Sequence, residues 1–379
     1  MTKRPLGVYI HIPFCVRKCR YCDFLSFSEK EEQMVSYVES LTEEIRCFFQ
    51  REPDYKVCSI YLGGGTPSIL EPKLTEKLLQ TVFMAADVAA DAEITTEANP
   101  GTLTREKLKA YKKAGINRLS LGLQSTVKQE LEYLGRIHCY EDFLESYHMA
   151  RQEGFSNLNV DLMSAIPLQT LESWEQTLLR ILELEPEHIS AYSLIVEEGT
   201  PFYEDERLEK LIPDEDTERA MYELTEKLLE KRGYQRYEIS NYAKPGRECR
   251  HNLIYWDRQD YIGFGLGAAS CIRDTRFSNT DHMESYLKQP FTDFYDRENL
   301  EKLSLQEQME EAMILGLRKT EGISKKVFSD RYGEQMDHIF GDVISKYQKE
   351  GLLEQKDDFI RFTKRGFDLS NIVLCEFLS

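Results

Sequence analysis

Short apolar segments alternate with amphipathic segments through the first two hundred residues of the chain. The longer segments carry apolar residues at the three- and four-residue spacing of a helix that buries one face. The sequence therefore predicts strands over residues 8–12, 57–62, 92–96, 118–123, 158–162 and 188–196. It predicts helices over residues 29–49, 72–86, 104–114, 127–134, 141–153 and 172–184.

This alternation predicts an α/β domain over residues 1–240, because apolar strands separated by helices are typical of a parallel sheet with crossover helices. Local signals agree with the boundaries. Pro13 ends the first strand, Thr104 is suited to cap a helix, and Gly115 is suited to end it. A charged amphipathic helix over 213–231, with a solvated outer face, and a further strand over 234–240 complete the predicted domain.

The pattern changes beyond residue 299. Helices over 304–317, 322–332 and 336–350 precede two short strands, at 352–353 and 359–362, and a last helix begins at Arg365. This order resembles a winged-helix domain, here assigned to residues 301–379. Its acidic and basic residues are interleaved, which favours a docking or lid module over DNA binding.

Residues 241–300 are interpreted as a connecting segment with two features. The first is the element His251-Asn252-Leu253-Ile254-Tyr255-Trp256. The second is the glycine-rich stretch from Gly263 to Gly267, which lacks the full G-x-G-x-x-G pattern and a clear βαβ context. Close backbone packing is therefore the favoured explanation of these glycines.

Polar residues gather where the predicted strands end. Gly63-Gly64-Gly65-Thr66 follows the second strand, and Glu97, Gln124 and Asp161 stand at the ends of later strands. The carboxyl ends of parallel strands meet on one face, which is where barrels of this type build their sites. Glu97 could instead cap a turn, and Asp161 could be a solvated edge residue. Their shared position favours one common site.

Three cysteines, Cys15, Cys19 and Cys22, follow the first predicted strand at C-x3-C-x2-C spacing. Thiolates on so short a loop can converge on one metal centre. A structural zinc site needs four ligands and is usually built from two C-x2-C pairs, and no matching pair follows here. A [4Fe–4S] cube held by three cysteines keeps one iron free for another ligand. The spacing favours such a cluster, with zinc and unligated thiols as the alternatives.

Composition narrows the class of protein. Hydrophobic residues make up 41% of the chain and charged residues 30%, as in soluble globular proteins, and no apolar run is long enough for a membrane span. The net charge of −18 argues against nucleic acid as a partner. The remaining cysteines are scattered, which is typical of reduced thiols in a cytoplasmic protein. They are Cys47, Cys58, Cys139, Cys249, Cys271 and Cys375.

Together these motifs resemble a known family. The cysteine spacing with Tyr21 before the last cysteine is similar to the radical S-adenosylmethionine (SAM) signature. The wider set resembles the oxygen-independent coproporphyrinogen III oxidase-like family, and within it the haem chaperones, over nearly the whole chain. The segments that carry the resemblance are Tyr9–Cys15, Gly63–Pro67, Gln124 and His251–Trp256.

The resemblance implies a partial (β/α)6 TIM-like barrel, the radical SAM core, with a [4Fe–4S] cluster at its C-terminal rim. SAM would chelate the free iron, and an electron from the cluster could cleave its sulfonium to a 5′-deoxyadenosyl radical. Cys15, Cys19 and Cys22 would ligate the irons. Positions matching the family's SAM contacts are Tyr9, Tyr21, Gly64, Gly65, Thr66, Glu97, Gln124, Arg136 and Asp161.

Two departures separate the chain from the oxidase pattern. Phe24 stands where the oxidase has a further cysteine, and only a few residues precede Val8, where the oxidase has a longer segment. Both favour a haem chaperone that delivers haem to acceptor haemoproteins, including respiratory, membrane-associated ones, with a reductant supplying the cluster. The alternative is oxidative decarboxylation of coproporphyrinogen III to protoporphyrinogen IX, in porphyrin biosynthesis.

His251 is a candidate for the haem site, because imidazole is a common axial ligand of haem iron. The alternative is that His251 and Asn252 hydrogen bond within a loop while Tyr255 and Trp256 pack. A lone histidine does not decide between the two interpretations.

Overall fold

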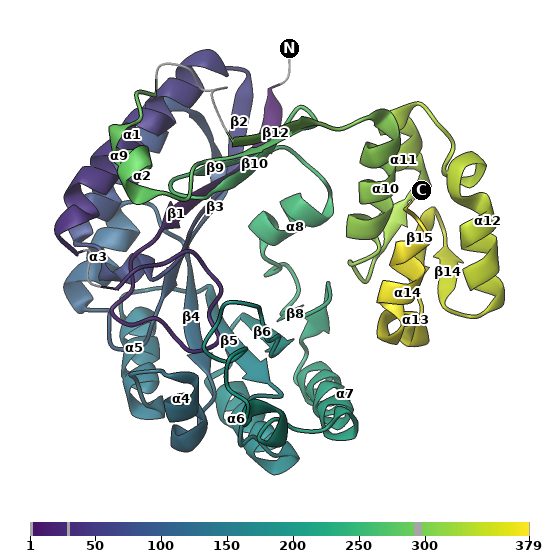
Figure 1. Cartoon of the computed structure of the whole chain (residues 1–379), viewed down its shortest axis with the longest axis horizontal. Coiled ribbons are helices and arrows are strands. Elements are labelled where there is room, and N and C mark those ends of the chain that lie inside the picture. The colour runs from purple at the N-terminus through teal and green to yellow at the C-terminus, as the bar shows by residue number, and fades with distance from the viewer. Residues whose placement is uncertain (1–2, 29–30, 292–297, 379) are drawn as a thin grey trace.

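The computed structural model describes residues 3–28, 31–291 and 298–378 of the chain. Parallel strands form its centre: β1 (Arg4–Ile12), β2 (Tyr55–Gly64), β3 (Asp87–Ala98), β4 (Arg118–Gln124), β5 (Leu158–Ser164) and β6 (His188–Ser193). The helices that follow them are α1 (Met34–Arg51), α2 (Pro72–Ala85), α3 (Arg105–Lys113), α4 (Lys128–Leu134), α5 (Tyr140–Gln152) and α6 (Leu171–Leu184). Figure 1 shows these helices along the outer face of the curved sheet.

The central strands make a barrel that does not close. Each strand from β1 to β6 pairs in parallel with the next one along the chain. On their other sides, β1 pairs with the later strand β9 (Tyr261–Phe264) and β6 with β8 (Asn241–Ala243). The predicted α/β fold with a partial (β/α)6 barrel is therefore confirmed.

Strand alternation explains how the barrel acquires a polar interior. Along β1, Leu6, Val8 and Ile10 are fully buried on one face, which packs against the outer helices. The intervening residues Tyr9 and His11 lie on the opposite face, toward the barrel interior, where the Tyr9 hydroxyl and His11 Nδ1 are 3.0 Å apart. Apolar burial thus holds the helices, while polar side chains fill the inside of the barrel.

Residues 241–300, predicted as a connecting segment, extend the large sheet at its edges. The strand order is β12-β11-β10-β9-β1-β2-β3-β4-β5-β6-β8-β7. Besides β8 and β9, this segment contributes α8 (Arg250–Trp256), β10 (Ala269–Ile272), β11 (Thr275–Ser278), α9 (Met283–Lys288) and β12 (Glu298–Lys302). Two elements precede it, α7 (Glu215–Lys231) and β7 (Gln235–Arg236).

The glycine-rich stretch is explained by close packing, as predicted. A Cβ on Gly263 would lie 2.4 Å from the carbonyl oxygen of Ala269. Gly265 has a φ of 99°, and a Cβ there would lie 2.5 Å from the hydroxyl of Tyr37 on α1. Only glycine fits at either position.

The C-terminal domain has the winged-helix order of elements: α10 (Leu305–Gly316), β13 (Ile323–Ser324), α11 (Lys325–Tyr332), α12 (Met336–Lys349), β14 (Leu353–Lys356) and β15 (Phe359–Phe362). Two short helices follow, α13 (Lys364–Asp368) and α14 (Ser370–Cys375). This domain buries its own apolar core, which includes Met313, Phe328, Phe340 and Ile360. It lies beside α7 and α8 in Figure 1.

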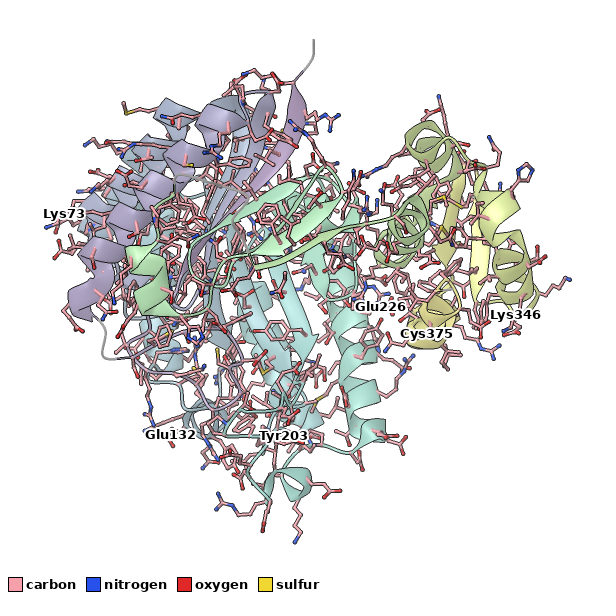
Figure 2. All side chains as sticks on the ribbon, turned by 45° about the horizontal axis from the view of Figure 1, so that its top comes forward. Lys73, Glu132, Tyr203, Glu226, Lys346 and Cys375 are labelled. Carbon is pink, nitrogen blue, oxygen red and sulfur yellow. The ribbon has the colours of Figure 1, made fainter. Side chains whose placement is uncertain are left out.

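Polar contacts join the C-terminal domain to the barrel. Arg219 of α7 pairs with Asp368 at 2.7 Å, and Arg331 of α11 donates to the carbonyl oxygen of Asp257 at 3.1 Å. Figure 2 shows Glu226 of α7 facing this domain, and it pairs with Lys364. Across the described part of the chain, no helix combines the length and apolar character needed to cross a membrane.

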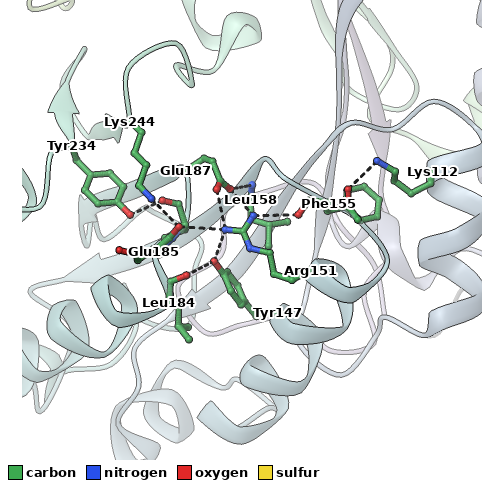
Figure 3. A network of polar contacts seen from close by, with 12 residues as sticks. Lys112, Tyr147, Arg151, Phe155, Leu158, Leu184, Glu185, Glu187, Tyr234 and Lys244 are labelled. Atoms are coloured by element: carbon green, nitrogen blue, oxygen red, sulfur yellow. Dashed lines mark hydrogen bonds and ion pairs between the residues drawn. The ribbon is translucent and has the colours of Figure 1, made fainter.

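A polar network fixes the end of the barrel at which β5 and β6 begin (Figure 3). Arg151 of α5 contacts the Glu187 carboxylate at 2.8 and 3.1 Å, and the Leu158 amide donates to the same carboxylate at 3.0 Å. Tyr147 accepts from Arg151 at 2.7 Å and donates to the carbonyl oxygen of Leu184 at 2.9 Å. Because these groups are partnered within the protein, this end of the barrel has a structural role.

Several predicted elements differ in extent. The helix predicted over 29–49 begins with a 3-10 turn, Glu31–Gln33, followed by α1, and residues 29–30 lie outside the described residues. The strand predicted over 234–240 is wrong in length, because only Gln235–Arg236 pair. A turn ends it: the Tyr237 amide donates to the Asn241 carbonyl at 3.2 Å, and Glu238 accepts from the Ser240 amide at 3.2 Å.

Candidate functional site

The cysteine loop leaves the C-terminal end of β1 and is closed at its base. Phe14 bridges to Phe27, the Cys15 amide donates to the Phe27 carbonyl at 2.9 Å, and the Phe27 amide donates to the Pro13 carbonyl at 2.8 Å. Phe14 is buried against the core. The two ends of the loop are therefore anchored, and the residues between them project over the end of the barrel.

The three cysteines line one pocket, with a volume of about 260 Å³, together with residues from the strand ends. Most of the sequence-predicted site residues share this pocket: Tyr21, Gly64, Gly65, Thr66, Glu97, Gln124, Arg136 and Asp161. Tyr9 and His251 do not line it. The predicted residues at the strand ends therefore share one pocket, as expected, whereas Tyr9 and His251 lie outside it.

Polar side chains surround two of the thiols. The Thr66 hydroxyl donates to Cys15 Sγ at 3.5 Å, and Thr66 itself accepts from Asn99 Nδ2 at 2.9 Å. Arg136 donates from Nη1 to Cys19 Sγ at 3.5 Å and from Nη2 to Asn99 Oδ1 at 2.8 Å. Donors aimed at sulfur stabilise its thiolate form.

The chemistry of the thiols fits a metal cluster. Burial, with a smaller contribution from the nearby Cys19 and Cys15, raises the pKa of Cys22 to about 11. A positively charged metal centre offsets the cost of ionising this buried thiol, because a thiol that ligates a metal is deprotonated. Within the described residues, no three histidine, cysteine, aspartate or glutamate side chains are close enough to hold one metal ion. A [4Fe–4S] cube differs from such a site in that each thiolate binds its own iron.

The glycines after β2 allow the backbone to approach the cysteine loop. A Cβ on Gly65 would lie 2.6 Å from the carbonyl oxygen of Phe14, and the Gly65 amide donates to the Ile12 carbonyl at 2.9 Å. Gly64 has a φ of 109°, and a Cβ there would meet the His11 ring at 2.4 Å. Side chains at these positions would displace the loop that carries the thiols.

Glu97 is a carboxyl group that is partly neutral near pH 7. It accepts hydrogen bonds from the Tyr61 hydroxyl at 2.9 Å and from the Gly64 amide at 3.2 Å. Burial, followed by the nearby Asp161, raises the pKa of Glu97 to about 7. Its side chain still reaches the pocket, so a bound cation could draw it into its charged form.

Asp161 and Gln124 line the same pocket. Asp161 accepts from Ser120 Oγ at 2.9 Å and from Asn159 Nδ2 at 2.7 Å. Gln124 has a φ of 73°, and its side-chain oxygen accepts from the Tyr192 hydroxyl at 2.9 Å. Positive φ is uncommon for a residue with a side chain, and here it occurs at the end of β4, where the strand turns into the pocket.

Pocket residues that the sequence interpretation did not assign to the site include Asn99, Ser120 and Tyr192. Asn99 lies two residues after Glu97, and Tyr192 lies near the end of β6, so a strand-end position was their only signal. Ser120 lies inside β4. Sequence alone does not show which strand residues face the pocket.

Tyr9 and His251 lie in the barrel interior. The Tyr9 ring stacks on Tyr61, with the ring centres 6.4 Å apart. His251 is buried, and its ring also stacks on Tyr61, with the ring centres 5.1 Å apart. Its Nδ1 lies 2.8 Å from Ser59 Oγ and its Nε2 lies 3.0 Å from the Tyr255 hydroxyl.

Both ring nitrogens of His251 therefore already have partners inside the protein. Burial, followed by the nearby Arg118, lowers the pKa of His251 to about 3, so the ring is neutral at physiological pH. This arrangement supports the interpretation of His251 as an internal hydrogen-bonding residue.

Replacement of His251 with alanine is expected to lower the free energy of unfolding by about 2 kcal/mol, because it opens a cavity and leaves two buried hydroxyls without a partner. Urea unfolding followed by circular dichroism would measure the change. His282→Ala is the control, because His282 is exposed. Equal stability of the His251 variant and the wild type would contradict the structural role.

Comparison with known proteins gives matches over the whole chain. The model of the radical SAM superfamily matches residues 9–181, and that of the HemN C-terminal domain matches residues 303–369. The haem chaperone HemW of Bacillus subtilis (strain 168) is 38% identical over 376 residues, which are 98% of this chain and 99% of that protein. HemW of Lactococcus lactis subsp. lactis is 37% identical over 379 residues, 100% and 98% of the two chains.

A solved structure has the same fold. Coproporphyrinogen III oxidase (HemN) from Escherichia coli, a radical SAM enzyme, superposes with a TM-score of 0.87. The match covers 100% of this chain and 91% of that one, at 23% sequence identity. At that identity the likeness establishes the fold and leaves the activity open.

Proposed function

The chain belongs to the radical SAM superfamily, in the family of the haem chaperone HemW, and on that premise we propose that it binds haem and delivers it to acceptor haemoproteins. Radical SAM proteins carry a [4Fe–4S] cluster and SAM. In this proposal Cys15, Cys19 and Cys22 ligate the cluster, and the protein acts in the cytoplasm, with a reductant for the cluster and with respiratory, membrane-associated acceptors.

One observation carries the proposal of haem transfer: relatives named as haem chaperones match this chain from end to end. The residue after the cysteine motif supports it. Phe24 occupies the position of the oxidase's further cysteine, and its side chain is 65% exposed at the pocket. A phenylalanine supplies an apolar contact at this position and no further ligand.

The pocket residues are suited to hold SAM. Glu97 can pair with the amino group of SAM, and Arg136 with its carboxylate. Asp161 and Gln124 offer acceptors for ribose hydroxyls, and Tyr21 offers an aromatic face for the adenine. When bound, the cluster supplies an electron to the sulfonium of SAM. The protein's part is to orient SAM at the iron that the cysteines leave free.

Titration of the anaerobically reconstituted protein with haem is expected to saturate at one haem per chain, with a shift in the haem absorbance. His251→Ala should bind haem with unchanged affinity, because both ring nitrogens of His251 are engaged inside the barrel. Its affinity is compared with that of His282→Ala, which alters an exposed histidine. Absence of haem binding by the wild-type protein would overturn the proposed function.

The same preparation distinguishes the second candidate, oxidation of coproporphyrinogen III, which the complete set of SAM-site residues in the pocket favours. With SAM, a reductant and coproporphyrinogen III, the chaperone proposal expects no loss of propionate carboxyl groups. Mass spectrometry of the porphyrins would detect such a loss. Steady formation of protoporphyrinogen IX would establish the oxidase instead.

A further inference from the structure

Exposed apolar side chains line the cysteine pocket and a smaller cavity beside it. Phe24 is 65% exposed and lines the pocket itself. Val16 and Ile137 are 54% and 59% exposed and line a smaller cavity beside it, and the two cavities share Cys19 in their walls. Single exposed apolar side chains are common on soluble proteins, whereas several grouped at two adjoining cavities are typical of a binding surface.

Two cations lie among these apolar side chains. Arg17 and Lys18 are exposed and line the cysteine pocket with Phe24. Throughout residues 3–28, 31–291 and 298–378, neither side chain forms an ion pair. In a chain with a net charge of −18, adjacent cations without an acidic partner are available for an anionic ligand.

We propose that this rim, formed by Val16, Arg17, Lys18, Phe24 and Ile137, is the haem-binding surface. One face of the porphyrin lies against Phe24, and the two propionates pair with Arg17 and Lys18. The inference rests on the proposed function, because it gives the place at which the chaperone holds haem. A planar apolar ring with carboxylates at one edge matches an aromatic side chain beside adjacent cations.

The position of the rim on the cysteine loop has a consequence for affinity. Val16, Arg17 and Lys18 lie between Cys15 and Cys19, and Phe24 follows Cys22 by two residues. Ligation of the cluster therefore orders the loop segment that carries most of the haem contacts. Since a preordered surface loses less entropy on binding, cluster-loaded protein binds haem more tightly than cluster-free protein.

The charge contacts are tested with haem and with haem dimethyl ester, whose propionates are neutral. The reconstituted double variant Arg17→Gln/Lys18→Gln should bind haem about tenfold more weakly than the wild type and the ester with equal affinity. Lys231→Gln/Arg232→Gln is the matched control, an exposed adjacent pair at the end of α7. Iron and sulfide analysis confirms that all preparations carry equal cluster.

The apolar contact is tested separately. Phe24→Ser should weaken haem and its ester alike, by about tenfold, because both present the same porphyrin face. Phe83→Ser is the matched control, since Phe83 is 43% exposed on α2, outside the pocket.

The outcomes separate the surface from the function. A wild-type protein that binds neither ligand overturns the proposed function. A wild-type protein that binds haem, while the Arg17/Lys18 and Phe24 variants bind it within twofold of wild type, overturns the surface alone. Equal weakening of haem and ester by the double charge variant also overturns the propionate pairing.

Discussion

Cys22→Ala is expected to lose the [4Fe–4S] cluster almost completely, with iron and sulfide falling to about a tenth of the wild-type content after anaerobic reconstitution. In the proposed site each of the three thiolates would hold a different iron, and no other cysteine lines the pocket in the described part of the chain. Cys22 is only partly buried, so its replacement leaves the packed core of the barrel intact.

Two other cysteines serve as controls for this variant. Cys58 lies on β2 and Cys375 lies in the C-terminal domain, where Figure 2 labels it. Cys58→Ala and Cys375→Ala should retain wild-type iron and sulfide. Full cluster content in Cys22→Ala would contradict the assignment of the ligands. Bound zinc without acid-labile sulfide in the wild type would instead establish the zinc alternative.

Glu97→Gln is expected to stabilise the protein without cofactors by about 3 kcal/mol at pH 8 and to leave its stability unchanged near pH 4.5. The pKa of Glu97 is about 7 in the folded protein, against 4.5 for an unperturbed glutamate. Between these values the folded state binds more protons than the unfolded state, so wild-type stability falls as pH rises from 4.5 to 7. At 1.36 kcal/mol per pKa unit, that shift corresponds to about 3 kcal/mol.

Urea unfolding between pH 4.5 and 8.5 would measure this difference. Glu145→Gln, an exposed residue of α5, should follow the wild-type curve. Parallel stability curves for wild type and Glu97→Gln would show that the pKa of Glu97 is not raised.

SAM gives a second measurement on the same residue. The N–H groups of the SAM amino group would donate to Glu97 and favour its ionised form, so SAM binding should strengthen as pH rises through 7. Calorimetric titration of the reconstituted protein would show this trend in the wild type and not in Glu97→Gln. A wild-type affinity that is constant across this range would contradict pairing of Glu97 with the amino group.

The pocket and the barrel interior are in contact through Tyr61. Its hydroxyl donates to Glu97 at the floor of the pocket, and its ring stacks on His251 of α8. His251 is linked in turn to Tyr255 in the last turn of α8, and Asp257, just after this helix, accepts from Arg331 of the C-terminal domain. A chain of polar and aromatic contacts therefore connects the candidate SAM site with α8, the helix that lies next to the winged-helix domain.

Much of the fold followed from local pattern. Strand and helix periodicities located β1 to β6 and α1 to α6 within a few residues, because each element buries one face and its spacing is written in consecutive residues. The cap at Thr104 is present, with its side chain accepting from the Lys107 amide. The strand expected over 234–240 failed, because a turn stabilised by Glu238 replaces most of it.

Which residues line the pocket could be predicted from the sequence only in part. The three cysteines, Glu97 and Gln124 share a pocket because each ends or follows a parallel strand, and strand ends meet on one face. Tyr9 lies in the middle of β1 and faces the barrel interior. Asn99 and Tyr192 also lie at strand ends, but which strand-end side chains line the pocket depends on how the strands are assembled.

Sequence by itself determined the spacing of the three thiols, the alternation of strand and helix, and the phenylalanine where the oxidase has a cysteine. Covalent distance limits how far apart residues on a short loop can lie, so these features needed no tertiary information. Only the tertiary structure decided that His251 is enclosed and that, among the residues it describes, Arg17 and Lys18 form no ion pair, whereas the neighbouring Arg20 pairs with Asp205. His251 and Ser59 are 192 positions apart, and contacts over such separations depend on how the whole sheet is assembled.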